Sequence, residues 1–121
     1  PVVVRESHLL LCAFNMHKKF EPVSFRVWMS VLQRVPHSVL LLLHFNKHIQ
    51  QNIYLEASAA GIRSSRIKFL SRMNWERHLY RISACDLAVD NFIYTSHTTA
   101  TDILWQGVPL ITVDGKRNLC C

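Results

Sequence analysis

The chain has 121 residues, of which 50% are hydrophobic and 18% are charged, so it is long enough for one packed core and too apolar for wholesale disorder. Its 14 Lys and Arg against 8 Asp and Glu give a formal charge of +6, which favours an anionic partner such as nucleic acid, a phosphate ligand or an acidic membrane. Apolar stretches such as residues 39–43 are far shorter than a membrane span, and residues 1–6 lack the features of a signal peptide. Both classes are therefore disfavoured.

Short apolar runs of strand length alternate along the chain with patterns that have helical spacing. The runs that predict strands are residues 8–14, 38–45, 66–70, 86–90 and 109–113. The helices predicted between them begin at Pro22 and end before Pro36, cover residues 49–60 up to Gly61, follow an Asn74 cap as far as Cys85, and follow a Ser96 or Thr98 cap as far as Gly107.

Strand and helix thus repeat four times before a closing strand, which predicts an α/β fold with a Rossmann-like parallel sheet and flanking helices. Uninterrupted apolar strands are typical of sheets covered on both faces. We see no composition shift or repeat, and predict a single domain over residues 1–121. Because no further helix follows the last strand, we expect this domain to be partial and its sheet truncated.

The cysteines show no spacing of a zinc or redox motif. Cys12 and Cys85 lie among apolar residues and are predicted to be buried thiols, while Cys120 and Cys121 are adjacent in the chain. The histidines likewise lack metal-ligand spacing, so no metal site is predicted. A reduced compartment, cytoplasmic or nuclear, is the default for such a chain.

Ligands of open parallel sheets bind at the carboxyl ends of the strands, so each strand–helix junction is a candidate site. The first junction carries Lys18 and Lys19, which are either solvated surface lysines or, beside a pocket, a point charge for a phosphate. The third junction carries His78 and Arg81 on one face of a helix start, where a ring and a guanidinium can hold a flat base. An ordinary exposed helix face explains that spacing about as well.

The fourth junction is the most informative, because a polar run leads directly into a helix. Thr98 and Thr99 supply hydroxyls and free backbone amides at the helix start, which is a favourable place for an anion, and His97 precedes them. Asp102, one turn further, can accept hydrogen bonds from sugar hydroxyls. The alternative is a helix cap with incidental polar neighbours.

Several enzyme classes are poorly supported by the same residues. The chain has three glycines and no glycine-rich dinucleotide or P-loop motif, which argues against NAD enzymes and P-loop kinases. Ser96 has no flanking nucleophile-elbow glycines, so no Ser–His nucleophile is predicted. The basic residues are scattered and match no known nucleic-acid-binding module.

Residues 97–109 resemble the nucleotide-sugar motif of the O-linked N-acetylglucosamine (O-GlcNAc) transferases. The resemblance extends over roughly residues 8–115, in order and spacing. It is carried further by Phe14, Asn15, Lys19, Pro22, Trp28, Arg34, Val35, Pro36, Ser38, Val39, Leu40, Arg66, Ile67, Phe69, His78, Arg81 and Asp86. The family has a GT-B fold of two facing Rossmann-like lobes, and this chain resembles the C-terminal catalytic lobe.

The resemblance implies the UDP-GlcNAc-binding half of an inverting enzyme that transfers N-acetylglucosamine to Ser and Thr of cytoplasmic and nuclear proteins. It implies no metal or other cofactor, with UDP-GlcNAc as the donor substrate and no nucleic-acid or membrane partner. Lys19 would stabilise the departing diphosphate, with Met16 at a donor-contacting position. The residues implied in binding the rest of the donor are Met73, His78 and Arg81 at the uracil, Asp102 at the ribose, and His97, Thr98 and Thr99 at the phosphates and sugar.

Two of the departures from the family pattern fall near the implied donor. Met16 stands where the family commonly has Gln, and Trp75 where it commonly has Lys near the ribose. The family's other lobe, and the tetratricopeptide repeats through which it usually meets protein acceptors, lie outside the resemblance, so the isolated chain is expected to be inactive. The alternatives are a degenerate module that binds UDP or a partner without catalysis, and the lobe of a related protein O-fucosyltransferase. His97 and Asp102 favour the GlcNAc branch.

Overall fold

The computed structural model describes residues 8–15, 20–44, 46–71, 73–91 and 98–112. These residues form a five-stranded sheet and four α-helices. The strands are β1 (Leu9–Ala13), β2 (Ser38–Leu43), β3 (Ile67–Leu70), β4 (Leu87–Val89) and β5 (Leu110–Ile111). The helices are α1 (Pro22–Arg34), α2 (Lys47–Ala59), α3 (Trp75–Ile82) and α4 (Thr98–Trp105), with a short 3₁₀ turn at Ser64–Arg66.

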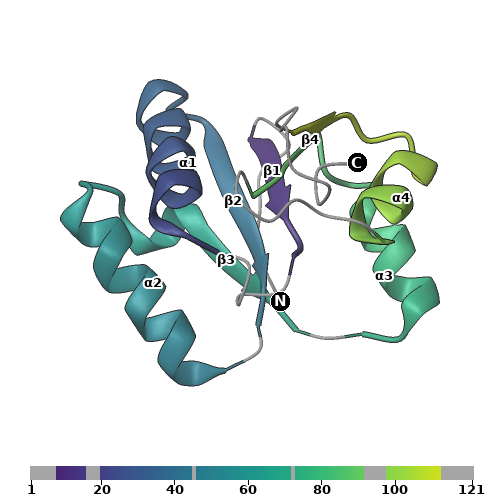
Figure 1. The fold of residues 1–121 in the computed structure, drawn as a ribbon, viewed down its shortest axis with the longest axis horizontal. Coiled ribbons are helices and arrows are strands. Elements are labelled where there is room, and N and C mark those ends of the chain that lie inside the picture. The colour runs from purple at the N-terminus through teal and green to yellow at the C-terminus, as the bar shows by residue number, and fades with distance from the viewer. Residues whose placement is uncertain (1–7, 16–19, 45, 72, 92–97, 113–121) are drawn as a thin grey trace.

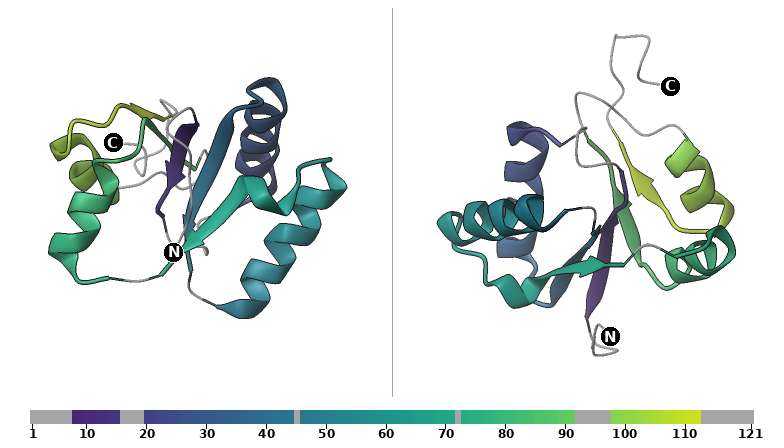
Figure 2. Two further views of the ribbon diagram at one scale, coloured as in Figure 1. Left: turned by 180° about the vertical axis from the view of Figure 1, so that it is seen from behind. Right: turned by 90° about the horizontal axis from the view of Figure 1, so that it is seen from below.

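All neighbouring strands are parallel, in the order β3-β2-β1-β4-β5 (Figure 1). Helices α1 and α2 lie on one face of the sheet, and α3 and α4 lie on the other (Figure 2). The strand order reverses direction at β1 and β4, which are direct neighbours. The predicted α/β fold with a parallel sheet and flanking helices is therefore confirmed.

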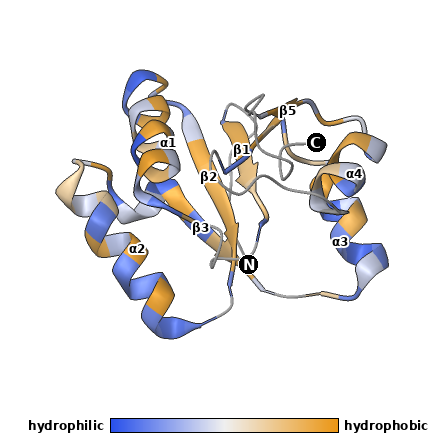
Figure 3. Ribbon diagram, in the orientation of Figure 1, coloured by the Kyte–Doolittle hydropathy of each residue, from blue (hydrophilic) through white to orange (hydrophobic). Residues whose placement is uncertain are grey.

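The sheet has a separate apolar core on each face, because successive side chains of a strand point to opposite sides. In β1, Leu11 and Ala13 face α1 and α2, whereas Cys12 faces α3 and α4. The hydropathy colouring shows mostly apolar strands and helices in which apolar and polar residues are mixed (Figure 3). Fully or nearly fully buried side chains of the first core include Trp28, Met29, Leu32, Leu40, Leu42, Ala57 and Ile67, and those of the second include Phe14, Leu41, Ile82, Ala88, Ile103 and Val108.

Local capping explains where the helices begin and end. Pro22 occupies the first turn of α1, where its missing N–H costs nothing, and the Glu21 carboxylate accepts from the amide of Ser24. Asn74 caps α3 by accepting from the amide of Arg77 at 2.9 Å, as the sequence predicts. Gly61 and Gly107 follow α2 and α4 with φ of 81° and 78°, in the left-handed region that glycine adopts without strain.

The third helix is shorter than predicted. It ends at Ile82, and the chain continues to Cys85 through a tight turn in which the Ala84 and Cys85 amides bond to the carbonyls three residues earlier. Such a turn also returns to the same face after three residues, so the apolar spacing of Ile82 and Cys85 does not distinguish it from helix. The predicted cap Ser96 lies outside the described residues, and α4 begins at Thr98.

The prediction of buried thiols is confirmed, since Cys12 and Cys85 are free and buried. Hydrogen bonding to Cys85, together with burial, raises the pKa of Cys12, so this thiol stays protonated. Within the ranges given above, no helix combines the length and the apolar character that crossing a bilayer requires. The same part of the chain contains no cluster of three or more His, Cys, Asp or Glu able to hold a metal ion.

Candidate functional site

The candidate functional residues lie at the carboxyl ends of the strands, on the side of the sheet that carries α3 and α4. Asn15 follows β1, Leu43 ends β2, and the segment from Met73 leads from β3 into α3. Asp90 and Asn91 follow β4, and α4 starts on the same side. This edge lies where the strand order reverses, which is the usual place for a ligand in an open α/β sheet.

A pocket of about 230 Å³ opens here, lined by Leu43, Met73, Trp75, His78 and Arg81. Leu43 supplies an apolar wall, Trp75 an exposed indole, and His78 and Arg81 the polar groups. The volume is below the roughly 300–1,000 Å³ of a typical pocket for a drug-sized ligand. The pocket therefore suits one ring of a ligand and not a whole nucleotide sugar.

His78 and Arg81 hold one another in a defined geometry. Arg81 Nη2 lies 3.0 Å from His78 Nδ1, and Arg81 Nη1 donates to the carbonyl of Ser71 at 2.7 Å. A guanidinium has no acceptor, so Nδ1 must accept, and the ring proton is therefore assigned to Nε2. The His78 ring also packs against Phe14 from the end of β1, with centroids 5.3 Å apart.

The charges of the pocket agree with that tautomer. Burial lowers the pKa of His78 below its ordinary value, the Arg81 cation lowers it further, and the Asp102 carboxylate opposes both. His78 is thus neutral at pH 7, with Nε2–H as a hydrogen-bond donor. Burial also lowers the pKa of Arg81, which remains a cation because its ordinary value is so high. Arg81 Nε is buried with no hydrogen-bond partner among the described residues.

The structure brings together some of the site residues predicted from the sequence. His78 and Arg81 share the pocket, Met73 lines it with 46% of its surface exposed, and Asp102 acts on His78 from α4. Thr99 is half-buried in the first turn of α4, which opens with Thr98. Met16, Lys19 and His97 lie outside the described residues, so their predicted roles stay predictions.

The sequence did not reveal a second polar group at this edge. Asn15, Asp90 and Asn91 are buried side chains joined by hydrogen bonds, although 75 residues separate Asn15 from Asp90. The sequence signals are their positions directly after two apolar strands, since the carboxyl ends of neighbouring parallel strands lie close together, and the place of Asn15 in the family resemblance.

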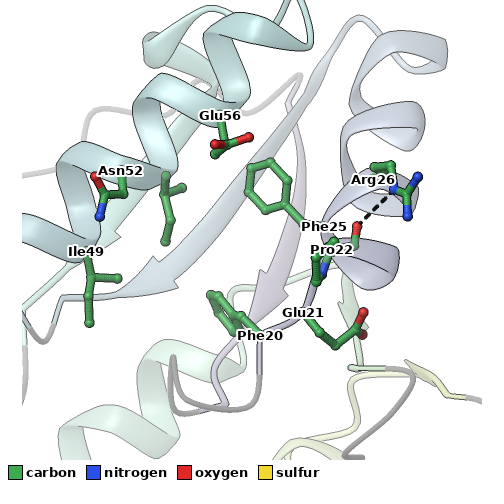
Figure 4. Close-up of a pocket in the computed structure, with 9 residues that line it drawn as sticks. Phe20, Glu21, Pro22, Phe25, Arg26, Ile49, Asn52 and Glu56 are labelled. Carbon is green, nitrogen blue, oxygen red and sulfur yellow. Dashed lines mark hydrogen bonds between the residues drawn. The ribbon is translucent and has the colours of Figure 1, made fainter.

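A different pocket, of about 620 Å³, lies between α1 and α2 on the other face of the sheet (Figure 4). Phe20, Phe25 and Ile49 give it a largely apolar lining. Two of its charged groups are already engaged, since Glu21 caps α1 and Arg26 Nε donates to the Pro22 carbonyl. Arg26 is the one cation among the described residues that line this pocket, and we place the candidate site at the α3–α4 side.

Comparison with known proteins identifies the family of this chain. The family model described as Glycosyl transferase family 41 matches residues 3–119. The chain belongs to glycosyl transferase family 41. The resemblance to O-GlcNAc transferases drawn from the sequence is thereby confirmed.

A family 41 relative from Arabidopsis thaliana, a probable UDP-N-acetylglucosamine–peptide N-acetylglucosaminyltransferase, is 33% identical over 108 residues. The match covers 89% of this chain and 11% of the relative, so the chain spans about a tenth of the relative's length. The match therefore shows which family this region belongs to, and it does not show the activity of a whole enzyme.

Two solved structures share the fold. A mutant O-GlcNAc transferase from Thermobaculum terrenum superposes with a TM-score of 0.89 at 23% identity, covering 95% of this chain and 23% of that one. The pneumococcal O-GlcNAc transferase GtfA, in complex with UDP and GlcNAc, gives a TM-score of 0.63 at 11% identity, covering 96% of this chain and 23% of that one. This family 41 chain thus has the fold of one region of such transferases.

Proposed function

We propose that this family 41 region is the donor-binding half of a protein O-GlcNAc transferase, which transfers N-acetylglucosamine from UDP-GlcNAc to Ser and Thr of proteins. The observation that carries the proposal is the pocket formed by His78 and Arg81, with Asp102 reaching the same edge from α4. A ring-sized pocket with a neutral imidazole donor, a guanidinium and an aromatic wall suits a pyrimidine base. Membership of glycosyl transferase family 41, together with the UDP-N-acetylglucosamine named for the Arabidopsis thaliana relative, supports UDP-GlcNAc as the nucleotide sugar.

In this proposal each group has one role in holding the donor. His78 and Arg81 contact the uracil, with the backbone near Met73 reading its edge, and Asp102 accepts from the ribose hydroxyls. Thr98, Thr99 and His97 bind the phosphates and the sugar, with Met16 beside them. The N-terminus of α4 favours the negative charge of the diphosphate.

The proposed transfer inverts the anomeric carbon. The acceptor hydroxyl forms a new bond to this carbon from the side opposite the diphosphate, the bond to the diphosphate breaks, and UDP leaves with the electron pair. The hydroxyl proton passes to a base outside this region. No metal or other cofactor takes part, and we expect the 121-residue chain alone to bind the donor weakly without transferring sugar. Protein acceptors are met through regions outside this chain, in the cytoplasm or nucleus.

Calorimetric titration of the chain with UDP, ADP and GDP tests the proposal. We expect UDP to bind most tightly, because a ring-sized pocket selects by the shape and edge of the base. Arg77→Ala is the control for charge, since it removes one exposed positive charge from the same helix and Arg77 does not line the 230 Å³ pocket. Equal weak binding of all three nucleotides, reduced equally by Arg77→Ala, would show general anion attraction instead.

Lys19 is expected to act on the leaving group. The diphosphate gains negative charge as the sugar bond breaks, so a cation beside it stabilises the transition state more than the ground state. In a full-length protein that contains this region, Lys19→Ala should lower turnover at least about tenfold, equivalent to about 1.4 kcal/mol of barrier. Steady-state kinetics with Lys18→Ala as the control measures this. Equal and small effects of both substitutions would mean that Lys19 is a solvated surface lysine.

Trp75 distinguishes two readings of the departure from the family pattern. Its side chain is 64% exposed and lines the pocket beside His78 and Arg81, where an indole can stack on a base or ribose. We expect Trp75→Lys to weaken UDP binding about tenfold, equivalent to about 1.4 kcal/mol, and Trp75→Phe to preserve it. Calorimetry on both variants measures this. Tighter binding by Trp75→Lys, strengthened further by Met16→Gln, would instead favour the second candidate function, a degenerate module whose donor site has decayed.

A further inference from the structure

A buried polar cluster lies at the carboxyl ends of β1, β4 and β5. Asn15 is 3% exposed, Asp90 2% and Asn91 0%. Asn15 Nδ2 donates to Asp90 Oδ1 at 3.0 Å and to Asn91 Oδ1 at 2.8 Å. Asp90 also accepts from the Asn91 amide at 2.8 Å and from Thr112 Oγ1 at 2.7 Å. One buried carboxylate therefore accepts hydrogen bonds from groups at the ends of three strands.

The orientation of the Asn15 amide is fixed by its partners. A carboxylate oxygen accepts hydrogen bonds, so the group facing Asp90 must be the NH₂ of Asn15. The Asn15 Oδ1 atom on the other side is buried and has no donor among the described residues. A buried polar atom without a partner is costly, and replacing a whole buried polar pair by apolar groups of the same shape is often neutral or better for stability. The cluster thus calls for an explanation other than stability.

Its place in the sheet suggests that explanation. The ladder between β1 and β4 is short, pairing Leu11 with Leu87 and Cys12 with Ala88. Beyond this ladder, the side-chain bond from Asn15 to Asp90 continues the link between the two strand ends. Asn15 immediately precedes residues 16–19, and Asn91 immediately precedes residues 92–97. The proposed donor residues Met16, Lys19 and His97 belong to those two segments.

We propose that Asn15 and Asp90 are positioning residues of the donor site. Their hydrogen bond fixes the ends of β1 and β4 relative to each other, at the edge of the sheet where the donor is proposed to bind. In this proposal neither residue contacts the reacting atoms. This inference rests on the proposed function, because it assigns the cluster to the donor that the same edge is proposed to bind.

Asn15→Asp tests the inference with almost no change of shape. It replaces the NH₂ donor by a carboxylate facing Asp90, so the two oxygens repel each other. Asn52→Asp, the same charge change at an exposed position of α2, is the matched control. We expect Asn15→Asp to raise the Kd for UDP at least about tenfold, the equivalent of about 1.4 kcal/mol, and Asn52→Asp to leave it within about threefold. In Asp90→Asn, the side-chain oxygen can still accept from Asn15, and the NH₂ group can donate a hydrogen bond to Thr112 Oγ1. We therefore expect its Kd for UDP to change as little as that of Asn52→Asp.

A role in stability alone is separated from positioning by a second core variant. Ile53→Ala truncates a buried side chain on α2, on the opposite face from the pocket. If positioning operates, Ile53→Ala lowers the melting temperature but leaves the UDP affinity of the folded chain unchanged. If Ile53→Ala weakens UDP binding as much as Asn15→Asp does, or if Asn15→Asp leaves UDP binding unchanged, the inference is overturned.

If the parent chain does not bind UDP, amide hydrogen exchange without nucleotide still tests whether Asn15 and Asp90 hold the strand ends together. That result would contradict the proposed function, while exchange still reports on the strand ends. The amides of Asp90 and Asn91 are bonded to the Ile111 carbonyl and to Asp90 Oδ1. We expect them to exchange at least about tenfold faster in Asn15→Asp than in Asn52→Asp, about 1.4 kcal/mol in opening free energy. Equal exchange in the two variants overturns the inference whatever the parent binds.

Discussion

Trp28→Ala is expected to lower the free energy of unfolding by about 3–5 kcal/mol, the usual range for truncating a buried tryptophan. Trp28 on α1 is 2% exposed within the core on the α1–α2 face, and the edge of its ring system meets Phe20 with centroids 5.1 Å apart. The loss combines apolar area returned to water with the cavity that the surrounding side chains fill only in part. Chemical denaturation of the parent and the variant, analysed with a common slope, measures it.

Trp28→Phe is the matched control for this prediction. The indole Nε1–H of Trp28 is buried with no hydrogen-bond acceptor among the described residues, which itself costs about 1–3 kcal/mol. Phenylalanine gives up some packing but also removes that unpaired donor, so we expect a net change within about 1 kcal/mol. A loss from Trp28→Phe as large as that from Trp28→Ala would show that the indole donor is satisfied and contributes to stability.

Arg66→Ala is expected to destabilise the chain by about 2–3 kcal/mol, because it removes a charged group that serves several carbonyls at once. Arg66 Nη2 donates to the carbonyls of Leu32 and Val35 at the end of α1, and to Ser38 at the start of β2. The Leu32 and Val35 carbonyls lie at the C-terminal end of α1, where carbonyls lack helical partners and a cation complements the helix dipole. Partial burial lowers the pKa of Arg66, but the guanidinium stays charged.

Urea denaturation of Arg66→Ala, Arg66→Lys and Arg63→Ala tests this account. Arg63 is an exposed neighbour that makes no side-chain cap, so its removal should change stability by less than about 0.5 kcal/mol. Lysine keeps the charge but not the planar fork, and should recover less than half of the loss. Equal stabilities of Arg66→Ala and Arg63→Ala would refute a structural role for the guanidinium.

Most of the fold could be predicted from the sequence because its signals are local. Apolar runs mark all five strands, Pro22 and Asn74 mark the starts of two helices, and Gly61 and Gly107 mark the ends of two others. The predicted third helix extends to Cys85, three residues too far, because a tight turn and a helix share the same three-residue spacing. Element ends are set by individual hydrogen bonds that periodicity does not contain.

The site could be predicted only where its residues follow one another in the chain. His78 and Arg81 are one helical turn apart, and the structure brings them together as their spacing predicts. The Asn15–Asp90 hydrogen bond joins residues 75 positions apart, and the hydrogen bonds of Arg66 join residues about 30 positions apart. Both therefore depend on which strands become neighbours. Strand order follows from packing of the whole chain, and no local pattern records it.

The lengths of the helices have a consequence for how this protein would respond to its ligand. Helices α3 and α4 have 8 residues each, fewer than the roughly 12–15 that an isolated helix needs to persist in water. Each therefore depends on its docking against the sheet, and this face is the part most able to open locally while α1 and α2 remain folded. A nucleotide held between α3 and α4, as proposed, would bind the closed form alone and act as a folding cofactor for that face. At 100 times its Kd it would contribute about 2.7 kcal/mol to the stability of the closed form of this face.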